Sequence, residues 1–327
     1  MRLGAALDSF FCWAAPSPIT NARAVFEKWQ WYAGSGDGKW PEVQARIRGD
    51  RFVGQAKVPV LPPKLPLWTL LGYGYDVSVF TNSSHEVIPM DTVRTENVSL
   101  QVADGTTMNA FVATPEDGGK LPGLLVFQEA FGVNAHIRDV TQRFAKQGYV
   151  AIAPELFHRT GPGFEGTYNN FPACMPHMQA LTPEGLINDA KAAFDWLQKS
   201  PRVLPNSTAS VGFCMGGRVS FLANTALPLK AAISFYGGGI ATALLPRAPQ
   251  IHAPMLFFWG GLDSHITPEQ TRAVIDAMKE AKKVYVNVEF SDADHGFFCD
   301  ARASYKETAA KQAWALSLTF LETYVRS

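Results

Sequence analysis

The stretch Ser210-Val-Gly-Phe-Cys-Met-Gly-Gly-Arg218 decides how the rest of the chain is interpreted. Apolar residues lead into a cysteine, Cys214, that has glycine two positions before it and two positions after it. This pattern is typical of a sharp turn from a strand into a helix, where larger flanking side chains would clash. The turn holds its central residue in a strained conformation, and the helix N-terminus behind it favours a thiolate. We therefore predict that Cys214 is a nucleophile, with a small buried core cysteine as the alternative.

Two further side chains follow Cys214 in the order that nucleophilic catalysis requires. Asp263 ends the run Trp259-Gly-Gly-Leu-Asp263, and His295 follows the next apolar run. Nucleophile, acid and histidine occur in this order along α/β-hydrolase chains. We expect His295 to exchange protons with the thiol and the leaving group, and Asp263 to fix its tautomer.

Three neighbouring residues compete for these assignments. Asp292 and Asp294 are acids in the loop of His295, where we expect them to form the turn. His265 follows Asp263 by two positions and is expected in a loop near the site entrance. The remaining histidines receive no role.

A carboxylate also follows an apolar strand earlier in the chain. The run Gly123-Leu-Leu-Val-Phe-Gln128 is followed by Glu129, Ala130 and Phe131. Sites in α/β proteins form at the carboxyl ends of such strands, so Glu129 is a candidate site residue rather than an ordinary surface glutamate.

From about residue 93 the sequence alternates between strand and helix patterns, with a hairpin signal at Asp104-Gly105. Strands are expected at residues 93–103, 108–114, 123–128, 149–153, 208–213, 230–236, 254–259 and 284–290. Helices are expected at residues 136–147, 183–199, from 215 onward, 268–281 and about 304–325. This alternation predicts an α/β fold, a mostly parallel central sheet with helices on both faces.

Residues 1–92 differ from the rest and are expected to form an N-terminal extension, with residues 93–327 as the catalytic domain. The extension carries five of the eight tryptophans, a possible short helix at 22–32, and a proline-rich stretch at 58–68 that must run extended. Because so many aromatic side chains aggregate when left in water, we expect the extension to pack on the catalytic domain or on a partner subunit.

Composition excludes several classes of protein. Equal numbers of basic and acidic residues, 29 of each, give no field that attracts nucleic acid. No apolar run approaches the length of a membrane span. Four dispersed cysteines without a CxxC suggest neither a disulfide framework nor a zinc site, so no metal or cofactor is expected. Asp8 interrupts a faintly signal-like N-terminus, which favours a cytoplasmic protein. A monomer or a homodimer is expected.

Several motifs occur together in one order, and with them the chain resembles the dienelactone hydrolase (carboxymethylenebutenolidase-like) family from about residue 93 to its end. These motifs are Gln128-Glu-Ala-Phe-Gly-Val-Asn134, Ala153-Pro-Glu-Leu-Phe157, Gly212-Phe-Cys-Met-Gly-Gly217, Gly261-Leu-Asp263 and His295-Gly-Phe297. An elbow cysteine combined with the Q-E-x-F-G-x-N motif is specific, and residues 1–92 lie outside the resemblance.

The resemblance implies an α/β-hydrolase fold and a small-molecule ester or lactone substrate. It implies Cys214 as nucleophile, His295 and Asp263 completing the triad, and Glu129 contacting the thiol in the resting enzyme. It further implies an oxyanion hole formed by the backbone N–H groups of Met215 and Ala130, and a thioester acyl-enzyme that water hydrolyses.

Two departures from the family pattern concern substrate charge. The family enzyme holds its substrate's carboxylate with two arginines. Here the segment 161–190 contains no Lys or Arg, and Cys299 stands at the other position. Arg159 and Arg302 lie near enough in sequence to act as substitutes, whereas Arg218 is expected to be structural.

These departures favour a substrate that is less acidic and more apolar than dienelactone. The same segment is rich in apolar side chains that either line the pocket or pack within a cap loop: Phe164, Tyr168, Phe171, Met175 and Met178. Together with Arg159, the pocket candidates are Phe131, Phe164, Tyr168, Phe171 and Phe297.

Two other functions stay open at this point. The same site also suits acyl transfer, lactone formation or isomerisation, since each passes through an oxyanion. The aromatic N-terminal extension is also compatible with a partner-binding protein that carries a vestigial hydrolase domain.

Overall fold

The computed structural model describes residues 44–46, 55–57 and 92–326. The chain divides into two units, Met1–Glu86 and Val87–Ser327. In the first unit, the described residues form β1 (Gln44–Arg46) and β2 (Gln55–Lys57), which pair antiparallel. The helix expected at 22–32, the extended run at 58–68 and the packing expected of the N-terminal extension all concern residues outside those described.

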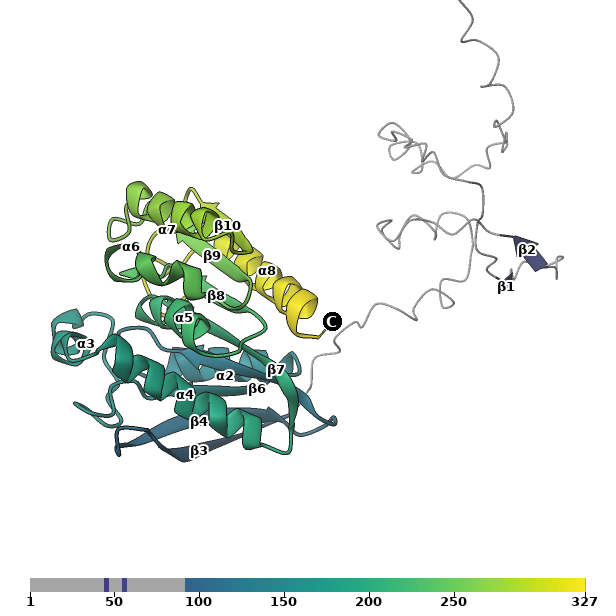
Figure 1. Cartoon of the computed structure of the whole chain (residues 1–327), viewed down its shortest axis with the longest axis horizontal. Helices are drawn as coiled ribbons and strands as arrows, with labels where there is room; N and C mark the ends of the chain where they lie inside the picture. The colour runs from purple at the N-terminus through teal and green to yellow at the C-terminus, as the bar shows by residue number, and fades with distance from the viewer. Residues whose placement is uncertain (1–43, 47–54, 58–91, 327) are drawn as a thin grey trace, which may run out of the picture. The chain divides into compact units, whose positions relative to one another are not determined.

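The second unit is built on an eight-stranded sheet in the order β10-β9-β8-β7-β5-β6-β4-β3 (Figure 1). The strands are β3 (Val93–Gln101), β4 (Thr107–Pro115), β5 (Leu121–Phe127), β6 (Val150–Pro154), β7 (Val203–Phe213), β8 (Ala232–Phe235), β9 (Met255–Gly260) and β10 (Tyr285–Phe290). β3 pairs antiparallel with β4 and β4 with β6, whereas all other neighbours are parallel. The predicted α/β class and the hairpin at Asp104-Gly105 are confirmed.

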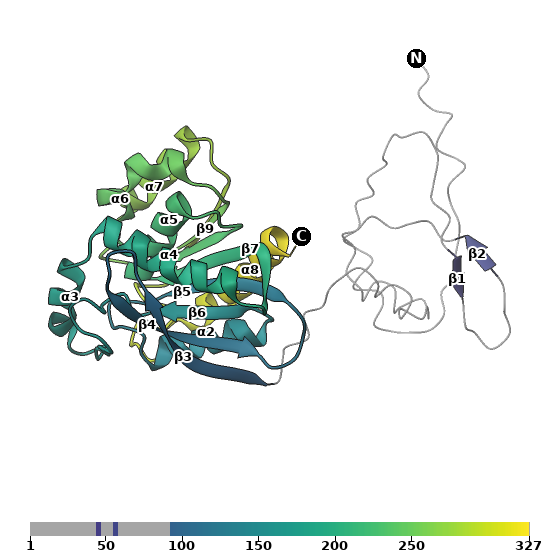
Figure 2. The same ribbon diagram turned by 60° about the horizontal axis from the view of Figure 1, so that its bottom comes forward.

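Helices cover both faces of this sheet (Figures 1 and 2). The longer helices are α2 (Ala135–Lys146), α4 (Pro183–Lys199), α5 (Met215–Ala226), α7 (Pro268–Glu280) and α8 (Glu307–Val325). Their starts follow capping rules: Asn134 caps α2, and Thr267 forms a capping box with Gln270 at α7. On one face α2 meets α8, where the rings of Phe144 and Trp314 lie 4.5 Å apart. Among the described residues, no helix is both long and apolar enough to span a bilayer.

The central strands place their carboxyl ends along one edge of the sheet. β6 and β9 are buried along their whole length, as expected for strands covered on both faces. Parallel pairing aligns Phe127 of β5 with Gly212 of β7, and Phe213 of β7 with Phe235 of β8. The residues that follow β5, β7, β8, β9 and β10 therefore meet at this edge.

Four short helical segments were not expected from the sequence. They are η3 (Phe171–Cys174), α3 (Met175–Gln179), α6 (Ile240–Ala243) and η4 (Leu245–Gln250). η3 and α3 lie in the segment 161–181, whose apolar side chains are expected either to line the pocket or to pack within a cap loop. Part of this segment packs onto Ala130 and Phe131 in a small cluster with Cys174, separate from the main core.

Candidate active site

Cys214 occupies the sharp turn between β7 and α5, with φ 53° and ψ −117°. This left-handed value is unfavourable for a residue with a Cβ, so the surrounding chain must enforce it. A Cβ on Gly212 would run into the carbonyl of Gly216, and a Cβ on Gly216 would meet the carbonyls of Phe127 and Gln128. Both glycines of the motif are therefore required by close backbone approach.

The structure brings Cys214, His295 and Asp263 into one chain of contacts. Nε2 of His295 lies 3.1 Å from Sγ of Cys214, and its Nδ1 lies 2.7 Å from Oδ2 of Asp263. The other carboxylate oxygen of Asp263 accepts the backbone N–H groups of His265 and Ile266 at 2.8 and 3.1 Å. Asp263 and His295 are buried, while Cys214 stays partly exposed to solvent.

Charge within this chain of contacts shifts two pKa values. Burial lowers the pKa of His295, but the charge of Cys214 and the hydrogen bond with Asp263 outweigh it and raise the pKa to about 10. Burial raises the pKa of Asp263, but its hydrogen bond with His295 and the charge of that ring hold it below its ordinary value. The arrangement thus favours an imidazolium ring at neutral pH.

Glu129 is fully buried at the end of β5. Its Oε1 accepts a hydrogen bond from Nη1 of Arg302 at 3.2 Å, and its Oε2 has no partner among the described residues. His136 and Cys299 place ligand atoms within 4.8 Å of it and of each other. Carboxylate, imidazole and thiol are groups that zinc accepts, but the guanidinium of Arg302 already balances the charge of Glu129 and opposes a second cation.

The N–H groups of Met215 and Ala130 lie in a setting that suits an oxyanion. Met215 is the first residue of α5, so its N–H has no acceptor within the helix. Within the described part of the chain, no carbonyl outside α5 accepts a hydrogen bond from Met215 or Ala130. Because Gly216 approaches the carbonyls of Phe127 and Gln128 so closely, the end of β5 lies against the start of α5.

Comparison with known proteins agrees with this architecture. The family model described as "Dienelactone hydrolase family" matches residues 108–325. A "Putative carboxymethylenebutenolidase" of Synechocystis is 36% identical over 227 residues, which cover 67% of this chain and 90% of that protein. The chain belongs to the dienelactone hydrolase family. It is therefore a hydrolase that acts on ester or lactone bonds.

Two further members of the dienelactone hydrolase family support the assignment. A protein of Escherichia coli K12 with the same name as the Synechocystis one is 32% identical and covers 68% of this chain and 84% of its own length. The crystal structure of a "Putative Dienelactone Hydrolase" from Klebsiella pneumoniae is 30% identical, covers 72% of this chain and all of its own, and superposes with a TM-score of 0.66.

Three of the aromatic candidates for the substrate pocket lie together near Glu129 and its arginine. The ring of Phe131 lies 4.6 Å from that of Tyr168 and 6.1 Å from that of Phe171. The guanidinium of Arg302 lies 5.8 Å from the ring centre of Phe131 and 6.0 Å from that of Tyr168. The hydroxyl of Tyr168 accepts hydrogen bonds from Asn134 and from the thiol of Cys299.

The other three pocket candidates make contacts outside this group of rings. Arg159 donates to the carboxylates of Asp104 and Asp189 at 2.7 to 2.9 Å, so its charge is already paired. Phe297 is fully buried and packs against Tyr236 and other core rings. Phe164 packs against Phe157 and His177 and also against the cluster of Ala130, Phe131 and Cys174.

The structure also places Asp292, Asp294 and His265, the alternatives to Asp263 and His295. Asp292 forms an ion pair with Lys306 at 2.8 Å, and Asp294 accepts the backbone N–H of His295, as expected of residues that shape the turn. His265 is exposed, and its ring centre lies 5.4 Å from that of His295.

The sequence did not predict the neighbours of Glu129, which are Arg302, His136 and Cys299. Arg302 was named only as a possible substitute arginine, and His136 received no role. A usable signal lay in the sequence: a carboxylate that directly follows a buried apolar strand needs a cation to balance it, and Arg302 lies seven residues after His295.

Proposed function

We propose that the protein hydrolyses a small ester or lactone through a thioester intermediate on Cys214. The observation that carries this proposal is the continuous contact from the sulfur through both ring nitrogens of His295 to Asp263, at 3.1 and 2.7 Å. A nucleophile, a proton-transferring ring and an orienting carboxylate are the three parts that acyl transfer needs.

The reaction would begin when the thiolate attacks the carbonyl carbon. A C–S bond forms, and the carbonyl electron pair moves to the oxygen, which accepts the N–H groups of Met215 and Ala130. The oxyanion then collapses, the C–O bond breaks, and the leaving alkoxide takes the proton of the His295 imidazolium. Water next gives a proton to His295 and attacks the thioester. The C–S bond breaks, the acid leaves, and thiolate and imidazolium are restored.

Glu129 would control when the thiol reacts. Its buried carboxylate is held by Arg302 on one oxygen only, so little binds it in place on the other side. A substrate that enters over Phe131 would displace Glu129, and the movement of this negative charge away from Cys214 would further stabilise the thiolate. This role follows the pattern of the family.

The surface for the acyl group would be largely apolar. Phe131, Tyr168 and Phe171 supply aromatic rings, whereas the charges of Arg159 and Arg302 are already balanced by carboxylates. This neutralisation supports a substrate that is less acidic than dienelactone at this end of the site.

Hydrolysis of 4-nitrophenyl butyrate tests the proposal. We expect Cys214→Ala to lower kcat/KM by about a thousandfold or more, because the attacking atom is lost. Cys12→Ala, the same change at a cysteine outside the catalytic domain, is the control. Mass spectrometry of the acid-quenched wild type should show a butyryl group on the peptide that contains Cys214. Turnover that survives in Cys214→Ala rejects the proposed nucleophile.

A further inference from the structure

β10 forms one edge of the sheet, and apolar side chains at this edge reach solvent. Figure 1 shows the strand next to β9, with which it pairs without a break in register from Tyr285 to Phe290. Val284 and Val286 are 59% and 40% exposed, whereas every large apolar side chain of β3, at the opposite edge, is at least half-buried. Because the free backbone groups of an edge strand invite pairing, an open apolar edge indicates an interaction surface.

The backbone of β10 leaves alternate residues available to another strand. The carbonyls of Val284 and Phe290 accept N–H groups of β9 and of the residue that follows it. Successive residues of a paired strand direct their backbone groups to opposite sides. The N–H and C=O groups of Tyr285, Asn287 and Glu289 therefore point away from β9, toward the open edge.

The sequence of β10 is complementary to itself when a second copy runs antiparallel. With Val286 opposite the same residue of the other copy, Tyr285 lies opposite Asn287, so that outward backbone groups meet. Val284 then lies opposite Val288. These valines occupy the positions without backbone hydrogen bonds, where side chains of an antiparallel pair come closest. The exposed valines would thus cover one another.

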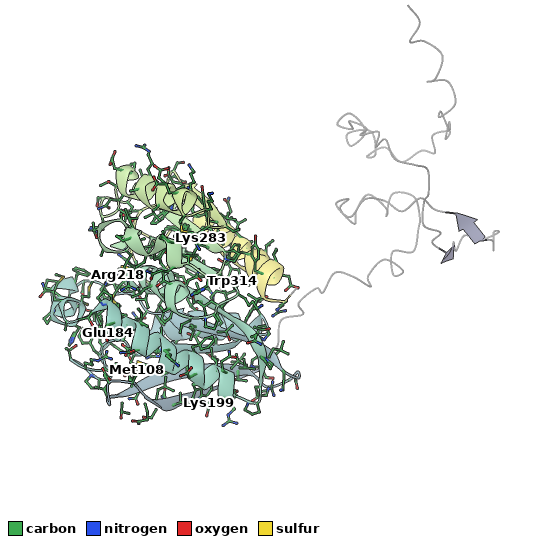
Figure 3. The ribbon with its side chains drawn as sticks, in the orientation of Figure 1. Met108, Glu184, Lys199, Arg218, Lys283 and Trp314 are labelled. Atoms are coloured by element: carbon green, nitrogen blue, oxygen red, sulfur yellow. The ribbon has the colours of Figure 1, made fainter. Side chains whose placement is uncertain are left out.

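Charge selects this register. With Val286 at the centre, Lys283 of each copy lies opposite Glu289 of the other, and a shift of two residues in either direction removes both pairs. Figure 3 labels Lys283, which lies just before β10. Among the described residues, Lys283 and Glu289 take part in no ion pair, whereas the nearby Lys279 and Lys306 do. Opposite charges directly across two strands stabilise the pairing, and like charges destabilise it.

We propose that β10 binds β10 of a second copy of this chain, so that two eight-stranded sheets join across a twofold axis. A strand that matches itself in charged, apolar and hydrogen-bonding positions fits an identical copy, as a twofold interface requires. Residues 283–289 of each copy would take part, and so short a contact favours a dimer that dissociates reversibly at about micromolar concentration. Such a dimer does not depend on the reaction at Cys214.

Charge reversal tests both the partner and the register. Sedimentation velocity between about 1 and about 100 µM measures the dissociation constant of the dimer. Lys283→Glu places two carboxylates opposite each other, and Glu289→Lys places two ammonium groups opposite each other, so we expect each change to raise the constant at least tenfold. Glu96→Lys, the same change on β3, is the control and should leave the constant unchanged.

A mixture of the two variants provides the sharpest comparison. In a mixed pair, the strand with two carboxylates meets the strand with two ammonium groups, so the mixture should associate at least tenfold more tightly than either variant alone. Misfolded variants would not recover in this way, and circular dichroism of each verifies the fold. A wild type that stays monomeric at about 100 µM overturns the proposal. A dimer that charge reversal leaves unchanged, or a mixture that does not associate, also overturns it.

Hydrogen exchange distinguishes a second copy from a covering segment of the same chain. The N–H groups of Tyr285, Asn287 and Glu289 should exchange more slowly as the concentration of the wild type rises, and Lys283→Glu should remove this dependence. Protection of these groups that is the same at every concentration would assign the edge to another segment of the same chain, and the proposal would fail.

Discussion

The imidazole of His295 is the residue on which the charge of the site depends, because it lies between a sulfur and a carboxylate. We expect Cys214→Ala to lower the pKa of His295 from about 10 towards its ordinary value of 6.5, since burial then opposes the charged ring and only Asp263 supports it. Two-dimensional NMR of the ring protons measures this value. Cys174→Ala is the control, and an unchanged pKa in Cys214→Ala would contradict the assigned contact.

The raised pKa of His295 also gives stability a pH dependence. The folded state binds this proton more tightly than the unfolded chain, so the contribution is complete below about pH 6.5 and is lost as the pH rises through about 10. Urea unfolding at a series of pH values should show this loss in the wild type. A free energy of unfolding that increases between pH 7 and pH 10 would contradict it.

The ion pair between Glu129 and Arg302 should matter far more than an exposed one. Glu129→Gln leaves the half-buried guanidinium of Arg302 without its countercharge, which we expect to cost about 3 kcal/mol in the free energy of unfolding. Glu165→Gln breaks the exposed pair with Arg138 and should cost less than about 1 kcal/mol. Urea denaturation measures the free energy of unfolding of both variants. Equal losses would show that the burial of Glu129 does not strengthen its ion pair.

At the residue scale, the sequence predicted the residues that lie in local motifs but not the contacts between distant positions. Cys214, Asp263 and His295 were predicted because each follows a strand of the parallel part of the sheet, whose carboxyl ends meet at one edge. The bond between Arg302 and Glu129 joins positions 173 residues apart, and no periodicity in the sequence links them. Such a contact depends on loop conformations, which propensities do not determine.

At the scale of elements, a substitution in the turn between β7 and α5 tests how closely the backbone packs there. Gly212→Ala places a methyl group against the carbonyl of Gly216, so we expect a loss of about 1–3 kcal/mol and a large fall in kcat. Gly119→Ala meets no atom within 4 Å and should change neither quantity appreciably. Thermal unfolding and ester hydrolysis provide the two readouts. Normal turnover in Gly212→Ala would show that the elbow tolerates a side chain.

Regular patterns predicted the long elements from residue 93 onward, while short or polar segments were missed. β7 begins at Val203 rather than at the expected residue 208. Its first half was missed because Pro205, Asn206 and Ser207 are residues typical of turns. Asn206 has a φ of 56°, so this half of the strand is irregular. The prolines of η3 and α3 likewise suggest a loop, although they stand at helix starts, where proline is tolerated.

At the scale of the whole molecule, every described contact of the site lies within the unit Val87–Ser327. We therefore expect a chain that lacks Met1–Glu86 to keep its fold and to hydrolyse 4-nitrophenyl butyrate within threefold of the full chain. Circular dichroism, ester hydrolysis and size-exclusion chromatography measure fold, activity and assembly. An insoluble or inactive truncated chain would instead support the expectation that the N-terminal extension packs on the catalytic domain.

The hydroxyl of Tyr168 connects three parts of the molecule through hydrogen bonds. It accepts bonds from Asn134 at the start of α2 and from Cys299 in the loop after His295, while its own segment packs on Phe131. A displacement of that segment away from α2 and from the loop after His295 must break both bonds together. The position of that segment is therefore linked to the thiol of Cys299, which lies outside the contacts of Cys214, His295 and Asp263.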